Sequence, residues 1–234
     1  MKHIKSEALL VRAIAYGESD VIATLLTATD GKIAVMVRGA RKSSKRVGGA
    51  LEPFHTIEVA IDDRGGELGT LKEARILRVR AGIVGSLAAL DAAGTALRWA
   101  RHLCPPRIPE PAAWETMLAL LDALDSPGVS PRIALAVAAL KLLGDVGYAL
   151  DLERCVSCGK ACPEDRPACV DVARGGIVCT SCGGARARIT PELRHLALQI
   201  LAGENPSVTA SQADDLLLLV DDAMAAHTGF QAGS

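Results

Sequence analysis

Four cysteines late in the chain form two pairs, with two residues inside each pair and twenty between the pairs. A short pair presents two sulfur atoms from one tight turn, and a long loop can bring the second turn opposite the first. One tetrahedral Zn²⁺ ion bound by four thiolates needs this arrangement. Glycine follows the second cysteine of each pair, where such a turn needs positive φ. The predicted ligands are Cys155, Cys158, Cys179 and Cys182.

Two other kinds of chemistry remain open for these cysteines. A Cys-x2-Cys pair can be a redox couple, but that motif normally opens a helix in a thioredoxin-like unit, which the surrounding sequence does not resemble. Cys162 and Cys169 lie between the pairs, and the run Cys155-x2-Cys158-x3-Cys162-Pro163 suggests iron–sulfur ligation, although its spacing differs from the ferredoxin pattern. We interpret both as spare thiols or an alternate ligand pair. Four thiolates leave no coordination position for water, so we expect one structural zinc ion.

Positive charge is concentrated between residues 38 and 46. Five of these nine residues are basic and none is acidic: Arg38, Arg41, Lys42, Lys45 and Arg46. A flexible cationic connection suits a phosphate backbone, because each neutralised phosphate releases condensed counterions. The alternative interpretation is a solvated hairpin tip that binds nothing. Residues 1–80 carry a net charge of +4 within a chain of net charge −1, which places the basic segment in the positive part of the chain.

The first 80 residues are predicted to form β-structure. Residues 33–38 and 57–61 alternate apolar and other side chains with the period of a half-buried strand. The predicted strands cover 8–15, 21–27, 33–38, 57–61 and 68–79, and the last of these would also fit a helix. Five short strands without intervening helices favour a small closed barrel. Their number suits an OB-fold better than a two-sheet sandwich, which needs about seven strands.

Helical patterns follow this region. Proline and serine or threonine signals delimit predicted helices at 83–103, 114–124, 131–143, 190–202 and 211–227. We therefore predict an α+β protein with four segments: an OB-fold barrel at 1–80, a helical domain at 81–153, a zinc-binding insertion at 154–188 and closing helices at 189–234.

Several classes of protein are disfavoured. We find no Walker A sequence, no His-Glu-x2-His, no Gly-x-Ser-x-Gly and no glycine-rich nucleotide fingerprint, so we do not expect an enzyme. The sequence shows no signal peptide and no apolar run long enough for a bilayer. We expect a cytoplasmic protein without membrane contact, and we do not expect its seven cysteines to form a disulfide framework.

Several short segments occur in a specific order along the chain. They are Tyr-Gly-Glu-Ser-Asp at 16–20, Leu-Leu-Thr at 25–27, Asp-Gly-Lys at 30–32, Arg-Gly-Ala-Arg at 38–41, Leu-Glu-Pro-Phe at 51–54 and Lys-Leu-Leu-x2-Val-Gly-Tyr at 141–148, which leads into the cysteine pairs. In these segments and their order the chain resembles RecO, a family of bacterial recombination mediators and DNA-annealing proteins.

This resemblance implies an N-terminal OB-fold, a helical domain, a zinc element and a role in recombinational repair of gapped DNA. It implies binding to single- and double-stranded DNA, to RecR and to the C-terminal tail of single-stranded-DNA-binding protein, indirect action on RecA, and association with the nucleoid. The DNA contacts would be Arg38, Arg41, Lys42, Lys45 and Arg46. Not all members keep the four cysteines, so the prediction of zinc depends on the spacing of the cysteines in this chain.

A second hypothesis is a zinc-ribbon module that binds nucleic acid or another protein without annealing strands. Comparing strand annealing and binding on matched DNA and RNA would separate the two hypotheses.

Overall fold

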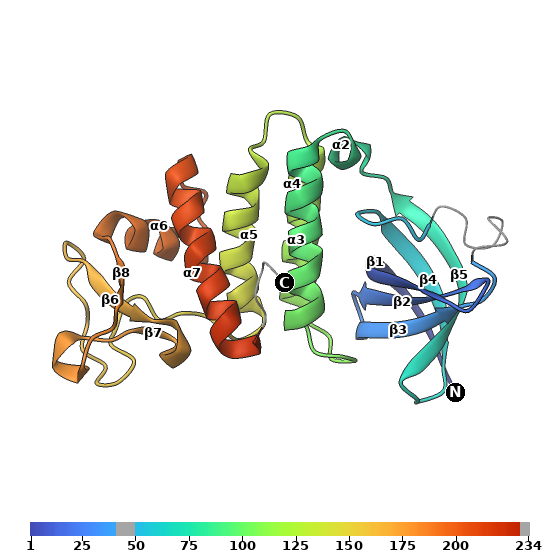
Figure 1. Ribbon diagram of the computed structural model, residues 1–234, viewed down its shortest axis with the longest axis horizontal. Helices are drawn as coiled ribbons and strands as arrows, with labels where there is room; N and C mark the ends of the chain where they lie inside the picture. Colours follow the sequence, from blue (N-terminus) through green and yellow to red (C-terminus); the bar gives the residue numbers. More distant parts are fainter. Residues whose placement is uncertain (41–49, 230–234) are drawn as a thin grey trace. The chain divides into compact units, whose positions relative to one another are not determined.

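The N-terminal strands of the computed structural model close into a five-stranded barrel (Figure 1). The structure describes residues 1–40 and 50–229. The strands are β1 (Lys2–Tyr16), β2 (Asp20–Thr27), β3 (Gly31–Val37), β4 (Thr56–Asp63) and β5 (Leu68–Arg78). Their order is β1-β2-β3-β5-β4, and β4 pairs with β1 to close the ring. β3 and β5 are parallel, whereas the other neighbouring strands are antiparallel.

The alternation seen in the sequence determines which side chains enter the barrel. In β3, Ile33, Val35 and Val37 are buried, while the residues between them are only half-buried. The segment that fitted either a strand or a helix forms β5, which pairs with β4 along most of its length. The interior contains aliphatic side chains throughout, among them Ile4, Leu10, Leu25, Ile33, Val35, Ile57, Val59, Ile61 and Leu71.

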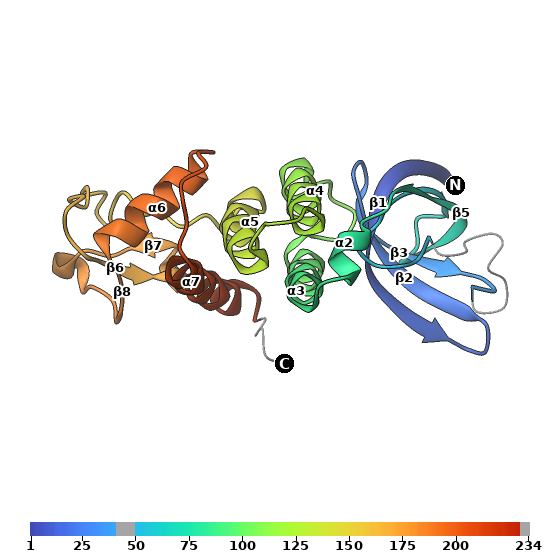
Figure 2. The same cartoon turned by 90° about the horizontal axis from the view of Figure 1, so that it is seen from above.

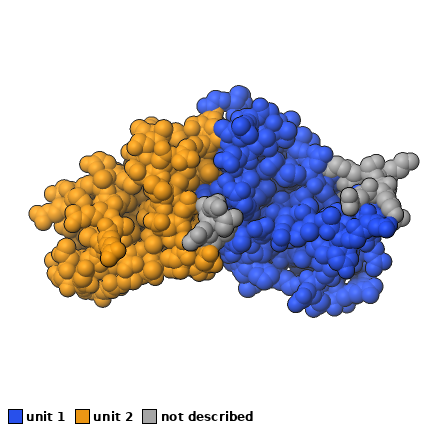
Figure 3. Space-filling view, viewed as in Figure 1, with its two compact units in different colours: residues 1–128 blue, residues 129–234 orange. Residues whose placement is uncertain are grey.

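The first of two compact units covers residues 1–128 (Figure 3), and three helices accompany the barrel in the described part of this unit. They are α2 (Ala81–Val84), α3 (Leu87–Leu103) and α4 (Pro111–Asp125). The prediction of one helix over 83–103 is wrong, because α2 ends before Gly85 and α3 begins only after Ser86. The Ser86 side chain accepts a hydrogen bond from the backbone N–H of Ala89 and thereby starts α3 as a separate helix.

A buried arginine joins the end of β5 to α4. Arg80 is only 1% exposed, and its Nε donates to Asp122 Oδ1 at 2.7 Å. Its Nη1 donates to the carbonyl of Phe54 and to Thr56 Oγ1, both at 2.9 Å. The guanidinium therefore ties the start of β4 to the helices through charge-assisted hydrogen bonds.

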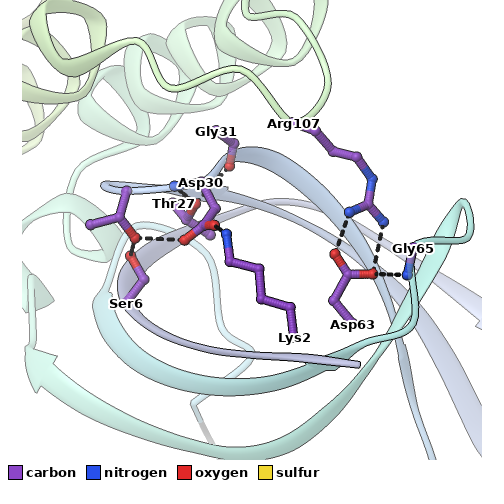
Figure 4. A network of polar contacts seen from close by, with 9 residues as sticks. Lys2, Ser6, Thr27, Asp30, Gly31, Asp63, Gly65 and Arg107 are labelled. Atoms are coloured by element: carbon purple, nitrogen blue, oxygen red, sulfur yellow. Dashed lines mark hydrogen bonds and ion pairs between the residues drawn. The ribbon is translucent and has the colours of Figure 1, made fainter.

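A second network lies at one opening of the barrel (Figure 4). Arg107, in the connection between α3 and α4, donates to the Asp63 carboxylate and to the carbonyl of Gly66. The backbone N–H of Gly65 also donates to Asp63, at 2.9 Å. At the same opening, Lys2 of β1 pairs with Asp30 in the turn between β2 and β3. The α3–α4 connection thus covers this opening.

The second unit covers residues 129–234, and its described part, up to residue 229, contains three helices and a small sheet. The helices are α5 (Pro131–Asp145), α6 (Pro191–Leu201) and α7 (Ala210–Thr228), and they pack on one another. Thr190 caps α6, and Thr209 with Gln212 forms a capping box for α7. Ser130 precedes α5 as expected, but its side chain makes no capping hydrogen bond.

The cysteine-containing segment forms a small sheet between α5 and α6 in sequence (Figure 2). Its strands are β6 (Ala168–Asp171), β7 (Gly176–Ile177) and β8 (Ala187–Ile189), in the order β7-β6-β8. Two single-turn 3₁₀ segments accompany them: η1 (Val172–Arg174) and η2 (Thr180–Cys182). The predicted mixture of an N-terminal sheet and later helices is confirmed. The predicted domain boundaries stay a prediction, and the division between the two units falls within 81–153.

Across the part of the chain that the structure describes, no helix combines the length and apolar character needed to cross a membrane.

Candidate metal centre and nucleic-acid interface

The first cysteine pair sits in a tight turn closed by backbone hydrogen bonds. The N–H of Gly159 donates to the carbonyl of Cys155 at 2.8 Å, and the N–H of Cys155 donates to the carbonyl of Lys160 at 2.9 Å. Gly159 adopts φ of +71°, as the position of glycine after Cys158 predicts. This geometry turns both side chains of the pair toward one side.

The second pair repeats the arrangement. The N–H groups of Cys182 and Gly184 donate to the carbonyl of Cys179 at 2.9 and 3.0 Å. Gly183 and Gly184 adopt φ of +100° and +62°, which residues with a Cβ rarely reach. Glycine is therefore required after both turns for the same steric reason.

Strand β7 brings the two turns together. The carbonyl of Ile177 accepts a hydrogen bond from Val156 N–H at 2.9 Å, which fixes the first turn against the strand. Cys179 follows the same strand after one residue, so the second turn begins where the first is anchored. The N–H of Cys179 also donates to Cys155 Sγ at 3.3 Å.

The four sulfur atoms converge as the spacing predicts. The Sγ atoms of Cys155, Cys158, Cys179 and Cys182 all lie within 4.8 Å of one another. Cys158 Sγ and Cys179 Sγ are 3.7 Å apart. A tetrahedron with metal–sulfur bonds of about 2.3 Å has edges of about 3.8 Å, so this separation fits two ligands of one metal ion. The group could therefore hold a metal ion.

The electrostatics of the four thiols also fit a cation. Backbone N–H groups, first that of Cys179, lower the pKa of Cys155 to about 5. Hydrogen bonds to Cys179 and Cys158 raise the pKa of Cys182 to about 12. The Cys155 thiol therefore ionises easily. Its negative charge then opposes ionisation of the adjacent thiols, as at Cys182. A divalent cation between the sulfurs removes that opposition.

The two remaining cysteines of the insertion lie outside this group. Cys162 Sγ accepts a hydrogen bond from Arg194 Nη1 at 2.6 Å. Cys169 lies in β6, opposite Arg188 of β8. Neither belongs to the set of four converging ligand atoms, which supports their interpretation as spare thiols rather than ligands.

The insertion is attached to helix α7. Nε2 of His227 lies 2.8 Å from the carbonyl oxygen of Val172 in η1. The His227 ring stacks on Tyr148, with ring centroids 5.1 Å apart and planes inclined by 24°. These contacts position the cysteine turns from outside the small sheet.

Of the five predicted DNA-contacting residues, Arg38 alone falls within the described residues. It is exposed directly after β3. The N–H of the next residue, Gly39, donates to Asp20 Oδ1 at 2.8 Å and so attaches the start of the basic segment to β2. The other four candidates, Arg41, Lys42, Lys45 and Arg46, lie outside the described residues.

Tyr16 lies beside this attachment point. It pairs with Asp20 at the end of the β1–β2 hairpin, and it is 55% exposed. The other aromatic residue of the barrel, Phe54, is buried. The sequence favours a core position for Phe54, which follows Pro53, and leaves the exposure of Tyr16 open. Tyr16 is therefore an accessible aromatic ring opposite Asp20, the residue that holds the chain directly after Arg38.

Comparison with known families accounts for nearly the whole chain. A family model described as the N-terminal part of recombination protein O matches residues 1–80, and one for its C-terminal part matches residues 85–234. The chain belongs to the RecO family. RecO membership places it among proteins of DNA repair and recombination, with DNA and recombination proteins as their general partners.

Individual RecO relatives agree over most of their length. The chain is 33% identical to a DNA repair protein RecO of Anaeromyxobacter sp. (strain K) over 217 residues, which cover 92% of this chain and 85% of the relative. It is 36% identical to that of Geobacter sulfurreducens over 192 residues, covering 82% and 78%. For Exiguobacterium sibiricum the identity is 35% over 176 residues, covering 75% and 68%.

Proposed function

We propose that this chain is a DNA-binding recombination mediator that anneals complementary single strands. With RecR it would assist RecA loading during repair of gapped DNA, and it would contact the C-terminal tail of single-stranded-DNA-binding protein. A nucleoid-associated location in the cytoplasm follows from these partners. The observation that supports this proposal most directly is that, in a chain of the RecO family, the basic segment attached to the five-stranded barrel begins at the exposed Arg38.

We infer that the barrel is an OB-fold. Five strands in the order β1-β2-β3-β5-β4, with β1 closing on β4 and β3 parallel to β5, support this assignment. OB-folds bind oligonucleotides on the face of their second and third strands and on adjoining loops. Arg38 and the hairpin that carries Tyr16 are connected to those strands.

The proposed DNA contacts are Arg38, Arg41, Lys42, Lys45 and Arg46. Binding through these cations would be dominated by phosphate contacts, with little base specificity and steep dependence on salt. Duplex DNA would also bind, which suits a protein that brings strands together.

Zn²⁺ is the metal that we propose for the four cysteines. Zinc supplies a fixed tetrahedral centre that stabilises the insertion, and four thiolates leave no position for a reactive water molecule. The remaining residues then act by binding and alignment, so we propose that the protein catalyses no covalent reaction.

The decisive experiment is annealing of two complementary strands that are first coated with single-stranded-DNA-binding protein. We expect the purified zinc-loaded protein to accelerate duplex formation over the uncatalysed rate, and charge reversal at Arg41, Lys42 and Lys45 to abolish the acceleration. Binding of RNA alone, or of no nucleic acid, would reject the proposal. Binding without annealing would favour a zinc-ribbon module that only holds nucleic acid or another protein.

A further inference from the structure

A groove opens beside the last helix of the second unit. Helix α7 forms one wall, and strand β8 with the start of α6 forms the other. Its lining includes Val170 of β6 and Ile189 of β8, both of which are buried. The groove has a volume of about 260 Å³, below the range of about 300–1,000 Å³ that is typical of small-molecule sites. This size suits a few side chains of a partner better than a whole small ligand.

Helix α7 turns one strip of side chains toward the groove. The members of the strip are three, four and seven positions apart, which places them on one face of the helix: Asp215, Leu218, Leu219 and Asp222. The buried residues of α7, among them Leu216, lie on the other side of the helix and pack within the unit. Helix α7 therefore carries a second apolar strip, bordered at each end by a carboxylate.

The middle of the groove is apolar and accessible. Leu218 is 64% exposed, more than most large hydrophobic residues of the described chain. A single exposed leucine needs no explanation, but Leu219 of α7 and Leu193 of α6 line the same groove and are half-buried. Burial of such side chains contributes about 25 cal/mol for each Å² of apolar surface removed from water. The groove can therefore hold apolar side chains of a partner.

The two walls of the groove differ in charge. Asp215 and Asp222 are exposed on the α7 wall, and Arg188 is exposed on the β8 wall. Within the described residues, none of the three belongs to an ion pair. The pKa of the neighbouring Asp221 is raised, first by burial and then by the charge of Asp222. Positive charge beside the α7 wall would relieve this repulsion.

The spacing of the two carboxylates defines the charge pattern of a fitting partner. Asp215 and Asp222 are two helical turns apart, about 10 Å along the axis of α7. A helix lying along α7 would match them with two basic residues seven positions apart, beside its own apolar strip. Its opposite edge could place an acidic side chain against Arg188. DNA and acidic peptide tails would be repelled by the α7 wall, so this groove does not suit the partners proposed above.

We propose that the groove binds an amphipathic helix of a partner protein. Its apolar side chains enter beside Leu218, and its basic side chains pair with Asp215 and Asp222. Binding of an amphipathic helix through anchors at such spacings is a recurring mode of peptide recognition. This inference goes beyond the proposed function, because the groove would accept such a helix whether or not the chain anneals DNA.

Selection from a displayed library of randomised helical peptides tests the inference. The peptides have about eighteen residues, which corresponds to about five helical turns, and the target is the immobilised full-length protein. We expect at least one family of enriched peptides to carry Lys or Arg at positions seven apart, next to apolar residues at helical spacing.

Charge reversal on α7 tests the polar contacts of an enriched peptide. Its affinity is measured by fluorescence anisotropy with a labelled copy. Asp215→Lys combined with Asp222→Lys should weaken binding about tenfold, because two exposed ion pairs become repulsions. The matched control combines Asp91→Lys with Glu115→Lys, which makes the same change in net charge at exposed positions of α3 and α4. The control should bind as tightly as wild type.

Truncation of the central leucine tests the apolar contacts. Leu218→Ala should weaken binding of the same peptide about tenfold, as loss of an anchor in the centre of an interface does. Leu87→Ala, at a position 84% exposed on α3, should leave the affinity unchanged. Both leucines are exposed, so neither variant should unfold, and urea unfolding checks this.

The outcomes decide the inference independently of DNA binding. It is overturned if no enriched peptide loses affinity in both α7 variants, or if the peptides that do are acidic. Sedimentation of the protein alone gives a further contrary outcome: a wild-type dimer that Leu218→Ala dissociates would show that a second copy of this chain covers the groove. Strand annealing by the wild-type protein tests the proposed function separately, and Leu218→Ala should anneal DNA as wild type does.

Discussion

Arg194 of helix α6 donates hydrogen bonds from its two Nη atoms to Cys162 Sγ and to the carbonyl of Pro163, both at 2.6 Å. Arg194 is only 2% exposed, although arginine is rarely buried without partners. The two bonds attach the loop after the first cysteine turn to the helix. Cys162 therefore has a structural partner of its own, which separates it from the four converging thiols.

That separation predicts different effects for two cysteine variants. Cys155→Ser removes one of four ligands, so zinc content should fall from about one equivalent to less than half an equivalent, with lower thermal stability. Cys162→Ser should keep about one equivalent. Metal analysis of the two purified variants checks this. Equal zinc loss in both would contradict the assignment of the four ligands.

Charge reversal in the basic segment should weaken DNA binding without unfolding the protein. The variant carries Arg41→Glu, Lys42→Glu and Lys45→Glu, and three lost phosphate contacts should lower the salt slope for single strands by roughly 2. Fluorescence anisotropy with labelled oligonucleotides measures the slope, and urea unfolding serves as the control for folding. Unchanged binding at moderate salt would show that the segment is a solvated tip.

Tyr16→Ala should reduce affinity for single strands. Stacking of a base on an aromatic ring contributes about 1–3 kcal/mol, which corresponds to a loss of roughly 5- to 150-fold. Tyr16→Phe should retain most of the affinity, because the ring remains. The same measurement on duplex DNA provides the contrast: a base in a duplex is already stacked, so the alanine variant should bind duplex nearly as well as wild type.

Arg80→Met should destabilise the first unit by about 3 kcal/mol, because it leaves the carbonyl of Phe54 and its neighbours without a buried donor. Arg78 pairs with the same Asp122 but is exposed, so Arg78→Met should cost no more than about 1 kcal/mol. Urea unfolding at neutral pH measures both. Similar losses of unfolding free energy in the two variants would contradict a larger contribution from the buried Arg80.

The Asp63 carboxylate should contribute to acid sensitivity. Hydrogen bonds, first from Arg107 and then from Gly65 N–H, hold the pKa of Asp63 below its usual range. A carboxyl group whose pKa is lowered on folding stabilises the protein above its unfolded pKa of about 3.9, and that stability is lost as the pH falls through the folded pKa.

Asp63→Asn should therefore lower stability at pH 7 by about 1–3 kcal/mol and flatten its decline below about pH 4. Unfolding in urea at several pH values measures this effect. Glu67→Gln, at an exposed carboxylate nearby, is the control. An acid decline as steep in Asp63→Asn as in wild type would assign the sensitivity to other groups.

Local signals in the sequence were sufficient for much of this structure. Thr190-Pro191 marks the start of α6, and glycines after the cysteine pairs mark both turns. The four-cysteine cluster follows from the same short-range pattern, because each turn fixes two thiols and one strand joins the turns. Ser86 could also have indicated the helix start that was missed, since it caps α3.

Long-range relationships could not be predicted in the same way. Arg80 and Asp122 are 42 residues apart, and nothing local identifies them as partners. Lys32 of β3 and Arg101 of α3 are 69 residues apart, yet Lys32 Nζ donates to the backbone carbonyl of Arg101. Their proximity depends on the register of the barrel and on the packing of α3 against β1, which periodicity does not determine.

The covered opening of the barrel limits how this protein can be divided. A Cβ atom at Gly31 would lie 2.2 Å from the carbonyl oxygen of Ile108, and Arg107 N–H donates to the carbonyl of Lys32 at 3.0 Å. The chain between α3 and α4 therefore rests directly on the backbone of β3. A fragment cut after residue 80 would uncover that backbone and lose the carboxylate that pairs with Arg80, whereas residues 1–128 keep both. Gene fusions that transplant the barrel should accordingly carry its helices with it.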